Sequence, residues 1–223
     1  MENLILEGGN YRIYSVDTQP QRHEVETLIR RMYSWRGYAV GSAVSPSGGD
    51  SHETLQVRRD HLTVGTMTVR FDSEKGLLAD GLYRDELDFI RQCGGTICEL
   101  TGLAIAPGED TTAVLNALFE AAYIVGAKKE VSDVVIEVNP RHVAHYRRLL
   151  GFRLAGPERR CDRVGGAPAV LLHLDLDALD ERFDFAPAWQ RQAGSYRRDR
   201  CSRQPYSNFI RFAAATGSPR KAA

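Results

Sequence analysis

Alternating runs of apolar and polar residues divide the chain into predicted strands and helices. Short runs rich in β-branched and aromatic residues predict strands, at residues 11–16, 53–71 (two strands joined by a tight turn at Arg59–Asp60), 96–105, 131–138, 152–156 and 168–176. Apolar residues at helical spacing predict helices, at residues 21–35, 82–92, 111–127 and 140–150. Because helices stand between strands, the order predicts an α/β or α+β fold with crossover connections.

The remaining segments have weaker patterns. Residues 41–51 are small and polar, which predicts a loop, and residues 177–192 predict a further helix broken at Pro187. Beyond about Gly194 the chain is polar, basic and poor in apolar residues. We therefore expect a folded domain at residues 1–185 and a basic, partly disordered C-terminal extension at residues 186–223.

Composition is that of an ordinary globular protein, with 43% hydrophobic and 26% charged residues among 223. The formal net charge is zero, which argues against nucleic acid as a partner. Basic residues nevertheless collect after Ala186: Arg191, Arg197, Arg198, Arg200, Arg203, Arg211, Arg220 and Lys221, against the single acid Asp199.

Three further absences bear on location and cofactors. No apolar run is long enough for a transmembrane helix, and the first residues lack the pattern of a signal peptide. The four cysteines, Cys93, Cys98, Cys161 and Cys201, do not have the spacing of metal ligands. A cytoplasmic protein with reduced thiols and no metal is expected.

Four sequence blocks together resemble one family. They are VGTMTVRF, ICELTGLAI, IEVNPRHVAHYRRLLGF and CDRVGGAPAVLLHLDL. They resemble the FeeM-type N-acyl amino acid synthases, which are relatives of the acyl-homoserine-lactone autoinducer synthases within the GNAT acyltransferase superfamily. The resemblance covers most of residues 11–177, and NPRHVAHYRRLLGF is its most specific part.

The resemblance implies a GNAT-like fold, in which a central mixed sheet flanked by helices contains two parallel strands that splay apart. An acyl-pantetheine thioester would lie between those strands and pair with exposed backbone, here at Leu103, Ala104 and Ile105. Asn139 would hold the pantetheine arm, and Tyr146 would protonate the leaving thiolate. The implied activity is transfer of a long acyl chain from an acyl carrier protein to an amino group.

Asn139 and Tyr146 also have a purely structural interpretation. Asn139 followed by Pro140 is typical of a helix N-cap with proline at the first helical position. Tyr146 stands one turn before the break at Gly151, where it could simply pack in the core.

Glu99 matches a glutamate of the autoinducer synthases that is implied to help deprotonate the attacking amine. The chemistry needs such a group, because an ammonium is not a nucleophile until it loses a proton. The alternative is a strand glutamate in a salt bridge. The chain departs from the family pattern at Gly102, where the resemblance implies arginine. The identity of the acceptor amine therefore cannot be inferred from the autoinducer synthases, and S-adenosylmethionine is disfavoured as the acceptor.

The acceptor amine is expected near the first predicted helix. Tyr33 and Trp35 fall where relatives build an acceptor lid, although aromatic residues in an amphipathic helix also serve as core. Arg70, at the end of TVRF, could pair with Glu99, bind an acceptor carboxylate through two parallel hydrogen bonds, or face solvent.

The start of the longest predicted helix bears on the acyl donor. GNAT enzymes that take coenzyme A carry a glycine-rich turn there, whose backbone N–H groups hold the pyrophosphate. Here Gly108 alone is present, and Glu109 and Asp110 place two carboxylates where phosphates would lie. This favours an acyl-phosphopantetheine thioester on acyl carrier protein over acyl-CoA as co-substrate, with no tightly bound cofactor.

An acidic carrier protein would need a basic docking surface near the thioester entrance. The candidates are Lys128, Lys129, Arg141, Arg147 and Arg148. The alternative for each is a solvated helix face.

Two other functions fit the same resemblance. One is an N-acetyltransferase that uses acetyl-CoA, and the other is a catalytically silent GNAT-like module that binds an acyl ligand or a protein partner. The joint presence of Glu99, Asn139 and Tyr146 argues against the silent module.

Overall fold

The computed structural model describes residues 3–38 and 51–176, and the chain divides into two compact units. The first unit contains residues 1–77, 98–131 and 160–168, and the second contains residues 78–97, 132–159 and 169–223. No helix among the described residues is both long and apolar enough to cross a bilayer.

The first unit is built on an antiparallel sheet with the order β1-β2-β3-β4-β5. Its strands are β1 (Asn3–Gly8), β2 (Tyr11–Ser15), β3 (His52–Arg59), β4 (Leu62–Phe71) and β5 (Ile97–Ile105). The predicted turn between β3 and β4 is confirmed, and Asp60 adopts a φ of 56° there. Asp is one of the few residues other than glycine that tolerate this conformation.

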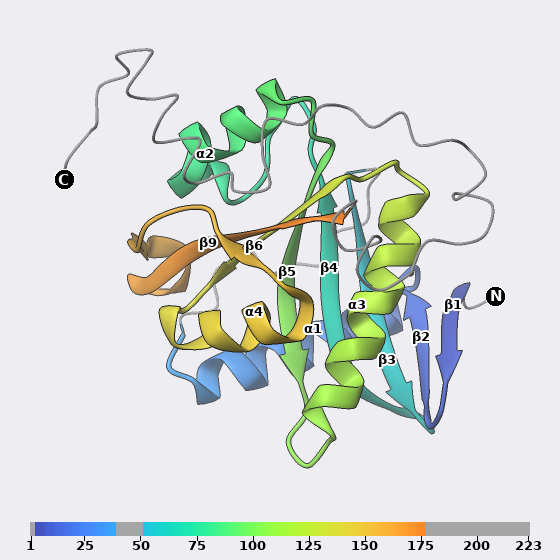
Figure 1. Cartoon of the computed structure of the whole chain (residues 1–223). Coiled ribbons are helices and arrows are strands. Elements are labelled where there is room, and N and C mark those ends of the chain that lie inside the picture. The colour runs from blue at the N-terminus through green and yellow to red at the C-terminus, as the bar shows by residue number, and fades with distance from the viewer. Residues whose placement is uncertain (1–2, 39–50, 177–223) are drawn as a thin grey trace, which may run out of the picture. The chain divides into compact units, whose positions relative to one another are not determined.

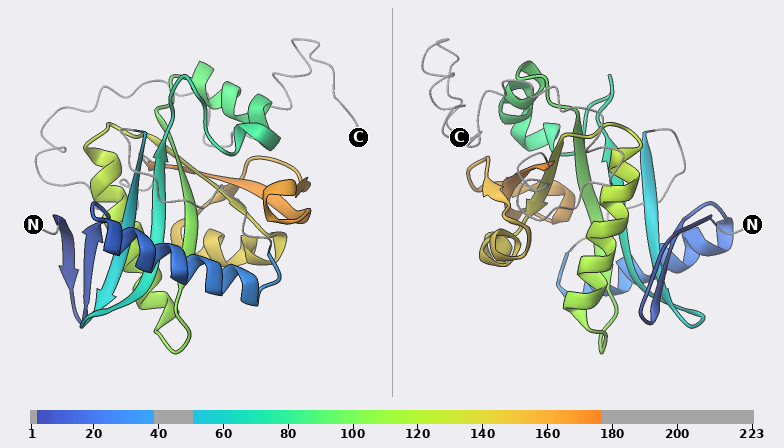
Figure 2. Two further views of the ribbon diagram at one scale, coloured as in Figure 1. Left: turned by 180° about the vertical axis from the view of Figure 1, so that it is seen from behind. Right: turned by 45° about the vertical axis from the view of Figure 1, so that its right-hand side comes forward.

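Two helices cover the two faces of this sheet (Figures 1 and 2). The helix α3 (Thr111–Ala127) lies on one face, and α1 (Gln19–Trp35) crosses the other. A Cβ atom at Gly65 would meet Val114 at 2.7 Å, so glycine allows α3 to approach β4 closely. Strand residues that point the same way as Gly65, including Leu55 and Met67, are fully buried and apolar.

The face of the sheet beneath α1 is polar, although its side chains are buried. The buried polar residues there are Thr54, Gln56, Thr66, Thr68 and Glu99. The hydroxyl groups of Thr54 and Thr68 are hydrogen-bonded at 3.0 Å. A polar face under a helix needs a specific reason, because apolar packing would be more stabilising than buried polar groups.

Glu24 of α1 anchors this helix to the polar face. Its carboxylate accepts hydrogen bonds from Gln56 at 2.8 Å and from Thr63 at 2.6 Å, and it pairs with Arg58 at 3.2 Å. Burial acts to raise the pKa of Glu24, but the hydrogen bonds from Thr63 and Arg58 prevail, and the pKa is lowered. The ionised form therefore holds α1 in place.

The second unit contains α2, a three-stranded antiparallel arrangement in the order β6-β9-β7, and α4. The bounds are α2 (Asp80–Gln92), β6 (Asp133–Val138), the 3₁₀ helix η2 (Pro140–His142), α4 (Val143–Leu150), β7 (Arg153–Leu154) and β9 (Ala167–Asp175). Between β7 and β9 the chain forms β8 (Arg159–Cys161) and a second 3₁₀ helix, η3 (Asp162–Val164).

A buried aromatic and ionic contact holds α2 within this unit. The hydroxyl of Tyr83 donates to the backbone oxygens of Ala169 and Pro157, at 2.7 and 3.1 Å. Arg159 pairs with the buried carboxylate of Glu86 at 2.7 Å and lies 4.7 Å from the centre of the Tyr83 ring.

The structure confirms the predicted elements from residue 11 to residue 175, with β7 shorter than expected. The short strands β1 and β8 were not predicted. The predicted loop at 41–51 falls almost wholly outside the described residues, as do the helix at 177–192 and the basic extension at 186–223. The domain boundary at residue 185 and the splay of β5 and β6, which belong to different units, stay predictions.

Candidate functional site

Three titratable or charged side chains stand in one row on the α1 face of the first unit. His52 of β3 lies opposite Arg70 of β4, and Arg70 lies opposite Glu99 of β5. Glu99 is buried, with 1% of its surface exposed, whereas His52 and Arg70 are half-buried. The predicted base and the predicted acceptor-binding arginine are therefore neighbours on the sheet.

Arg22, from the first turns of α1, completes this group. The pKa of His52 is lowered, first by burial and then by the positive charges of Arg70 and Arg22. In the described part of the chain, both ring nitrogens of His52 and the Nε atoms of Arg22 and Arg70 are buried without hydrogen-bond partners. Arg22 and His52 were missed from the sequence, because a single arginine or histidine in a polar stretch gives no signal.

Gly102 forms a bulge in β5, three residues beyond Glu99. Thr68 pairs with Thr101 while Thr66 pairs with Ala104, so β5 carries one extra residue opposite Met67. Gly102 has a φ of 61°, and glycine in this left-handed conformation is typical of the first position of a bulge. The backbone conformation therefore explains why glycine occupies position 102.

The predicted pantetheine-binding residues follow this bulge. Leu103 is half-buried, Ala104 is buried against the α1 side, and Ile105 lies opposite Gly65. Pantetheine is predicted to pair with the backbone of these residues at the edge of β5 that faces away from β4. This pairing stays a prediction.

The two aromatic residues at the end of α1 differ in their environment. Tyr33 packs against the apolar cluster that contains Leu28 and Ile29, and its ring meets that of Tyr38 edge-on at 6.0 Å. Trp35 is 74% exposed, so the interpretation of Trp35 as a core residue is wrong. The assignment of Tyr33 and Trp35 to acceptor binding stays a prediction.

Asp110 caps the start of α3. Its Oδ1 accepts hydrogen bonds from the backbone N–H groups of Thr112 and Ala113, both at 3.1 Å. These are among the donors that the first turn of a helix offers to an anion. The helix therefore carries its own negatively charged ligand.

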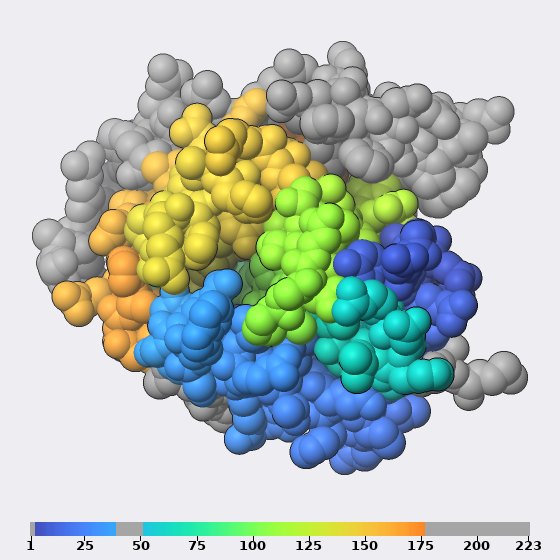
Figure 3. All heavy atoms as spheres, turned by 90° about the horizontal axis from the view of Figure 1, so that it is seen from below, coloured from blue at the N-terminus to red at the C-terminus, as the bar shows by residue number. Residues whose placement is uncertain are grey.

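Glu109 has a different partner from Asp110. It forms an ion pair with Arg59 at 2.8 Å, and its side chain is only 5% exposed. The hydroxyl of Tyr11 lies 3.4 Å away, and burial, then Glu109, raise the pKa of Tyr11. The start of α3 and the β3–β4 turn consequently lie side by side, as Figure 3 shows. Of the two predicted carboxylates, Asp110 alone occupies the helix N–H groups.

The second unit contains the connection from β6 to η2, which begins at Asn139. The side chain of Asn139 accepts a hydrogen bond from the N–H of Arg141 at 3.3 Å, and Pro140 is the first residue of η2. The N-cap interpretation of Asn139 is thereby confirmed. A role in holding pantetheine is compatible with it and stays a prediction.

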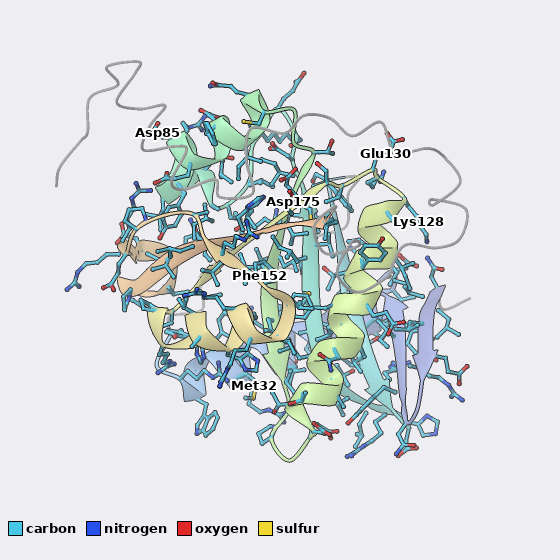
Figure 4. The ribbon with its side chains drawn as sticks, in the orientation of Figure 1. Met32, Asp85, Lys128, Glu130, Phe152 and Asp175 are labelled. Atoms are coloured by element: carbon cyan, nitrogen blue, oxygen red, sulfur yellow. The ribbon has the colours of Figure 1, made fainter. Side chains whose placement is uncertain are left out.

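Tyr146 lies on α4 and is half-buried. Its ring meets the rings of His145 and Phe152 edge-on, with centroid distances of 5.6 and 6.1 Å. Phe152, marked in Figure 4, is fully buried directly after the helix, which ends at the left-handed Gly151. Tyr146 therefore packs on the core through one edge of its ring without being enclosed by it.

The five predicted docking residues are exposed, but they divide between the units. Arg141, Arg147 and Arg148 lie on η2 and α4 of the second unit, where Arg141 donates to His142 at 3.1 Å. Lys128 and Lys129 follow α3 in the first unit (Figure 4), and Lys129 lies 5.9 Å from the centre of the Phe71 ring. A docking surface shared by all five residues stays a prediction.

Comparison with known proteins identifies a family. The profile described as N-acyl amino acid synthase FeeM matches residues 24–175. Among solved structures, FeeM, an N-acyl amino acid synthase from uncultured soil microbes, superposes with a TM-score of 0.70 at 23% identity, covering 77% of this chain and 93% of that one. No curated protein matches the sequence.

Two further structures are similar at lower identity. The acyl-homoserine-lactone synthase LasI has a TM-score of 0.55 at 15% identity, covering 76% of this chain and 91% of that one. A putative acyl-CoA N-acyltransferase from Klebsiella pneumoniae has a TM-score of 0.52 at 16% identity, covering 74% and 97%. These likenesses confirm the predicted mixed α/β class and GNAT-like acyltransferase fold, with mostly antiparallel strands flanked by helices.

Proposed function

Because the chain belongs to the FeeM family of N-acyl amino acid synthases and is an N-acyltransferase, we propose that it moves a long acyl chain from acyl carrier protein to an amine. The acceptor would be an amino acid or a similar small molecule. The product is an amide, and the carrier is released with a free pantetheine thiol.

The proposed chemistry assigns one proton transfer to each of two residues. Glu99 removes a proton from the acceptor ammonium, and the free amine then attacks the thioester carbonyl carbon. When the carbon–sulfur bond breaks, Tyr146 donates its proton to the departing thiolate. The burial of Glu99 beside Arg70, the predicted acceptor-binding residue, supports its role, since a general base must lie within reach of the proton that it removes.

The observation that carries the choice of donor is the cap at the start of α3. Asp110 already occupies the N–H groups of Thr112 and Ala113 that would bind a pyrophosphate. Coenzyme A would have to displace this carboxylate and then remain near its negative charge. An acyl carrier protein presents the pantetheine arm without the adenosine diphosphate, so it does not meet this conflict.

The exposed arginines of the second unit support a carrier protein as partner. Arg141, Arg147 and Arg148 place three positive charges on one short helical segment. Acyl carrier proteins are acidic, and complementary charge speeds such encounters and fixes their orientation. Lys128 and Lys129 of the first unit are proposed as further basic contacts for the carrier protein. A carrier-protein donor would also place the enzyme in the cytoplasm.

The test is to incubate the protein with acyl carrier protein loaded with mixed acyl chains and with pooled amino acids. Mass spectrometry should detect N-acyl amino acids. The same acyl group is then offered on carrier protein and on coenzyme A, and kcat/KM is compared. Equal values, or a preference for coenzyme A, would overturn the donor assignment, and absence of amide with either donor would favour a silent acyl-binding module.

A further inference from the structure

Four buried nitrogen atoms of the first unit have no hydrogen-bond acceptor among the residues that the structure describes. They are Nδ1 and Nε2 of His52, Nε of Arg22 and Nε of Arg70. Buried polar groups are nearly always paired, so a cluster of them requires an explanation. All four lie on the α1 face of the sheet, where His52 and Arg70 are direct cross-strand partners.

The charges of this cluster have one sign. Arginine stays protonated in proteins, so Arg22 and Arg70 are permanent cations, and both act to lower the pKa of His52. The bond from Arg22 Nη2 to the carbonyl oxygen of Asp17, at 3.3 Å, brings no countercharge. Among the described residues Arg22 forms no ion pair, whereas Arg70 has the Glu99 carboxylate opposite it on the neighbouring strand. The cluster thus has the donors and the positive charge that an anion needs.

We propose that Arg22, His52 and Arg70 form an anion-binding subsite that holds the carboxylate of the acceptor. A carboxylate offers two oxygens with four lone pairs, which can accept hydrogen bonds from two guanidinium groups and a histidine. The proposal rests on the proposed N-acyltransfer and assigns residues to the recognition of one substrate group. Arg22 and His52 are binding residues and take no part in bond making.

The position of Glu99 supports this assignment. Glu99 lies on the far side of Arg70 from His52, in the same row of the sheet. Directly opposed residues have Cβ atoms about 5 Å apart. An α-amino acid carries its ammonium and carboxylate on one carbon, so it can present the carboxylate to the cluster while its nitrogen faces Glu99.

Binding of the acceptor to the subsite is also coupled to protonation of His52. Burial and the two arginines oppose protonation of His52 while no anion is present. A bound carboxylate reverses this balance, so His52 takes up a proton with the acceptor. The groups that face His52 are Arg22 on α1 and Arg70 on β4, with Glu99 on β5 behind Arg70. Acceptor affinity should therefore increase as the pH falls.

The experiment uses the full chain with acylated carrier protein and a matched pair of acceptors, phenylalanine and its decarboxylated analogue phenethylamine. We expect kcat/KM to favour phenylalanine by about tenfold to a hundredfold, the range for a hydrogen-bonded charge. In Arg22→Gln and His52→Asn this ratio should fall toward one, chiefly through the KM of phenylalanine. Arg30→Gln is the matched control, because exposed Arg30 lies on the same helix and pairs with Glu26.

The acceptor ratio separates failure of the subsite from failure of the proposed function. Amide formed equally well from both acceptors would overturn the subsite while leaving N-acyltransfer intact. No amide from any acceptor would overturn the function itself. Unchanged ratios in Arg22→Gln and His52→Asn would also overturn the assignment.

Measuring the ratio of kcat/KM for phenylalanine to that for phenethylamine at several pH values tests His52 separately. Between about pH 6 and pH 8, the range in which histidine titrates, the ratio should decline in the wild type and stay level in His52→Asn. Loss of the ammonium proton affects both acceptors and cancels in the ratio. A level ratio in the wild type would remove His52 from the subsite.

Discussion

Arg70 of β4 lies directly opposite Glu99 of β5, and both side chains face α1. This relationship depends on the strand register, because a slip of one residue would turn Glu99 to the other face of the sheet. The bulge at Gly102 begins beyond this pair, so it shifts the partners of Ala104 and Ile105 and leaves Arg70 and Glu99 aligned. The pair therefore places a cation and a carboxylate side by side under the helix.

Glu99→Gln should retain the fold and slow amide formation by about a hundredfold or more, the effect of losing a general base. The amide keeps the size of the carboxylate but cannot accept the ammonium proton. The deficit should shrink as pH rises and free amine becomes abundant. Single-turnover acyl transfer at several pH values measures this, and a wild-type rate at neutral pH would make Glu99 structural.

Asp110→Asn should weaken discrimination against coenzyme A. Asparagine caps helices about as well as aspartate, so the fold is kept while the negative charge is removed. We expect the ratio of kcat/KM for acyl-CoA to that for acyl carrier protein to rise about threefold to tenfold. Asp85→Asn, at an exposed position of α2, makes the same change of net charge elsewhere and should leave the ratio unaltered. Equal effects of both substitutions would contradict the role of the cap.

Tyr146→Phe should slow acyl transfer about tenfold to a hundredfold, at the low end for a general acid. The ring and its contacts with His145 and Phe152 are retained, so stability should change by no more than about 1 kcal/mol. Affinity for the carrier should stay the same, since the proton is needed as charge develops on sulfur. A shifted melting temperature with an unaltered rate would indicate packing alone.

Gly102→Ala should destabilise the first unit by about 1–2 kcal/mol, the cost of a left-handed conformation for an ordinary residue. Space is not the cause, because the new Cβ would lie 3.5 Å from the hydroxyl of Thr68 and 3.7 Å from Ile29, both ordinary contacts. Gly102→Asn should cost less, since asparagine tolerates this conformation better. Urea unfolding measures both variants, and a larger loss in Gly102→Asn than in Gly102→Ala would point to crowding.

His52 should make folding stability depend on pH. Its pKa is lowered in the folded protein, so the unfolded chain binds more protons, and stability rises with pH. The contribution of His52 is present above its unfolded pKa of about 6.5 and is lost as the pH falls through the lower folded value. The melting temperature of the wild type should therefore fall more between about pH 7.5 and pH 5 than that of His52→Asn. Parallel pH curves would contradict this.

Most of the fold follows from local patterns along the chain. The alternation in β4 and the helical spacing in α3 predict these elements within a few residues. The strands β1 and β8 escaped prediction for physical reasons. NLILEG is short and near the start of the chain, and RRC owes its extended form to pairing with β9 and not to its own propensity.

The site was less accessible to sequence reasoning because its contacts depend on register. Counting outward from the turn at Asp60 would pair His52 with Val69, but an irregularity between Val57 and Arg58 shifts the ladder by one residue. His52 consequently meets Arg70, and the anion-binding subsite appears. Similarly, Glu109 forms an ion pair with Arg59, which lies fifty residues earlier in the chain, and no local pattern could indicate this partner.

The cap at the start of α3 also has a consequence for competition between ligands. Asp110 is joined to the amides it binds through one or two residues of the same chain, so it acts as an intramolecular ligand. Tethering of this kind corresponds to effective concentrations on the order of millimolar or above. Dissolved coenzyme A or another diphosphate of equal affinity for these amides must exceed that concentration to displace the carboxylate. The rate of acylation would then follow the supply of loaded carrier protein and stay insensitive to the size of the coenzyme A pool.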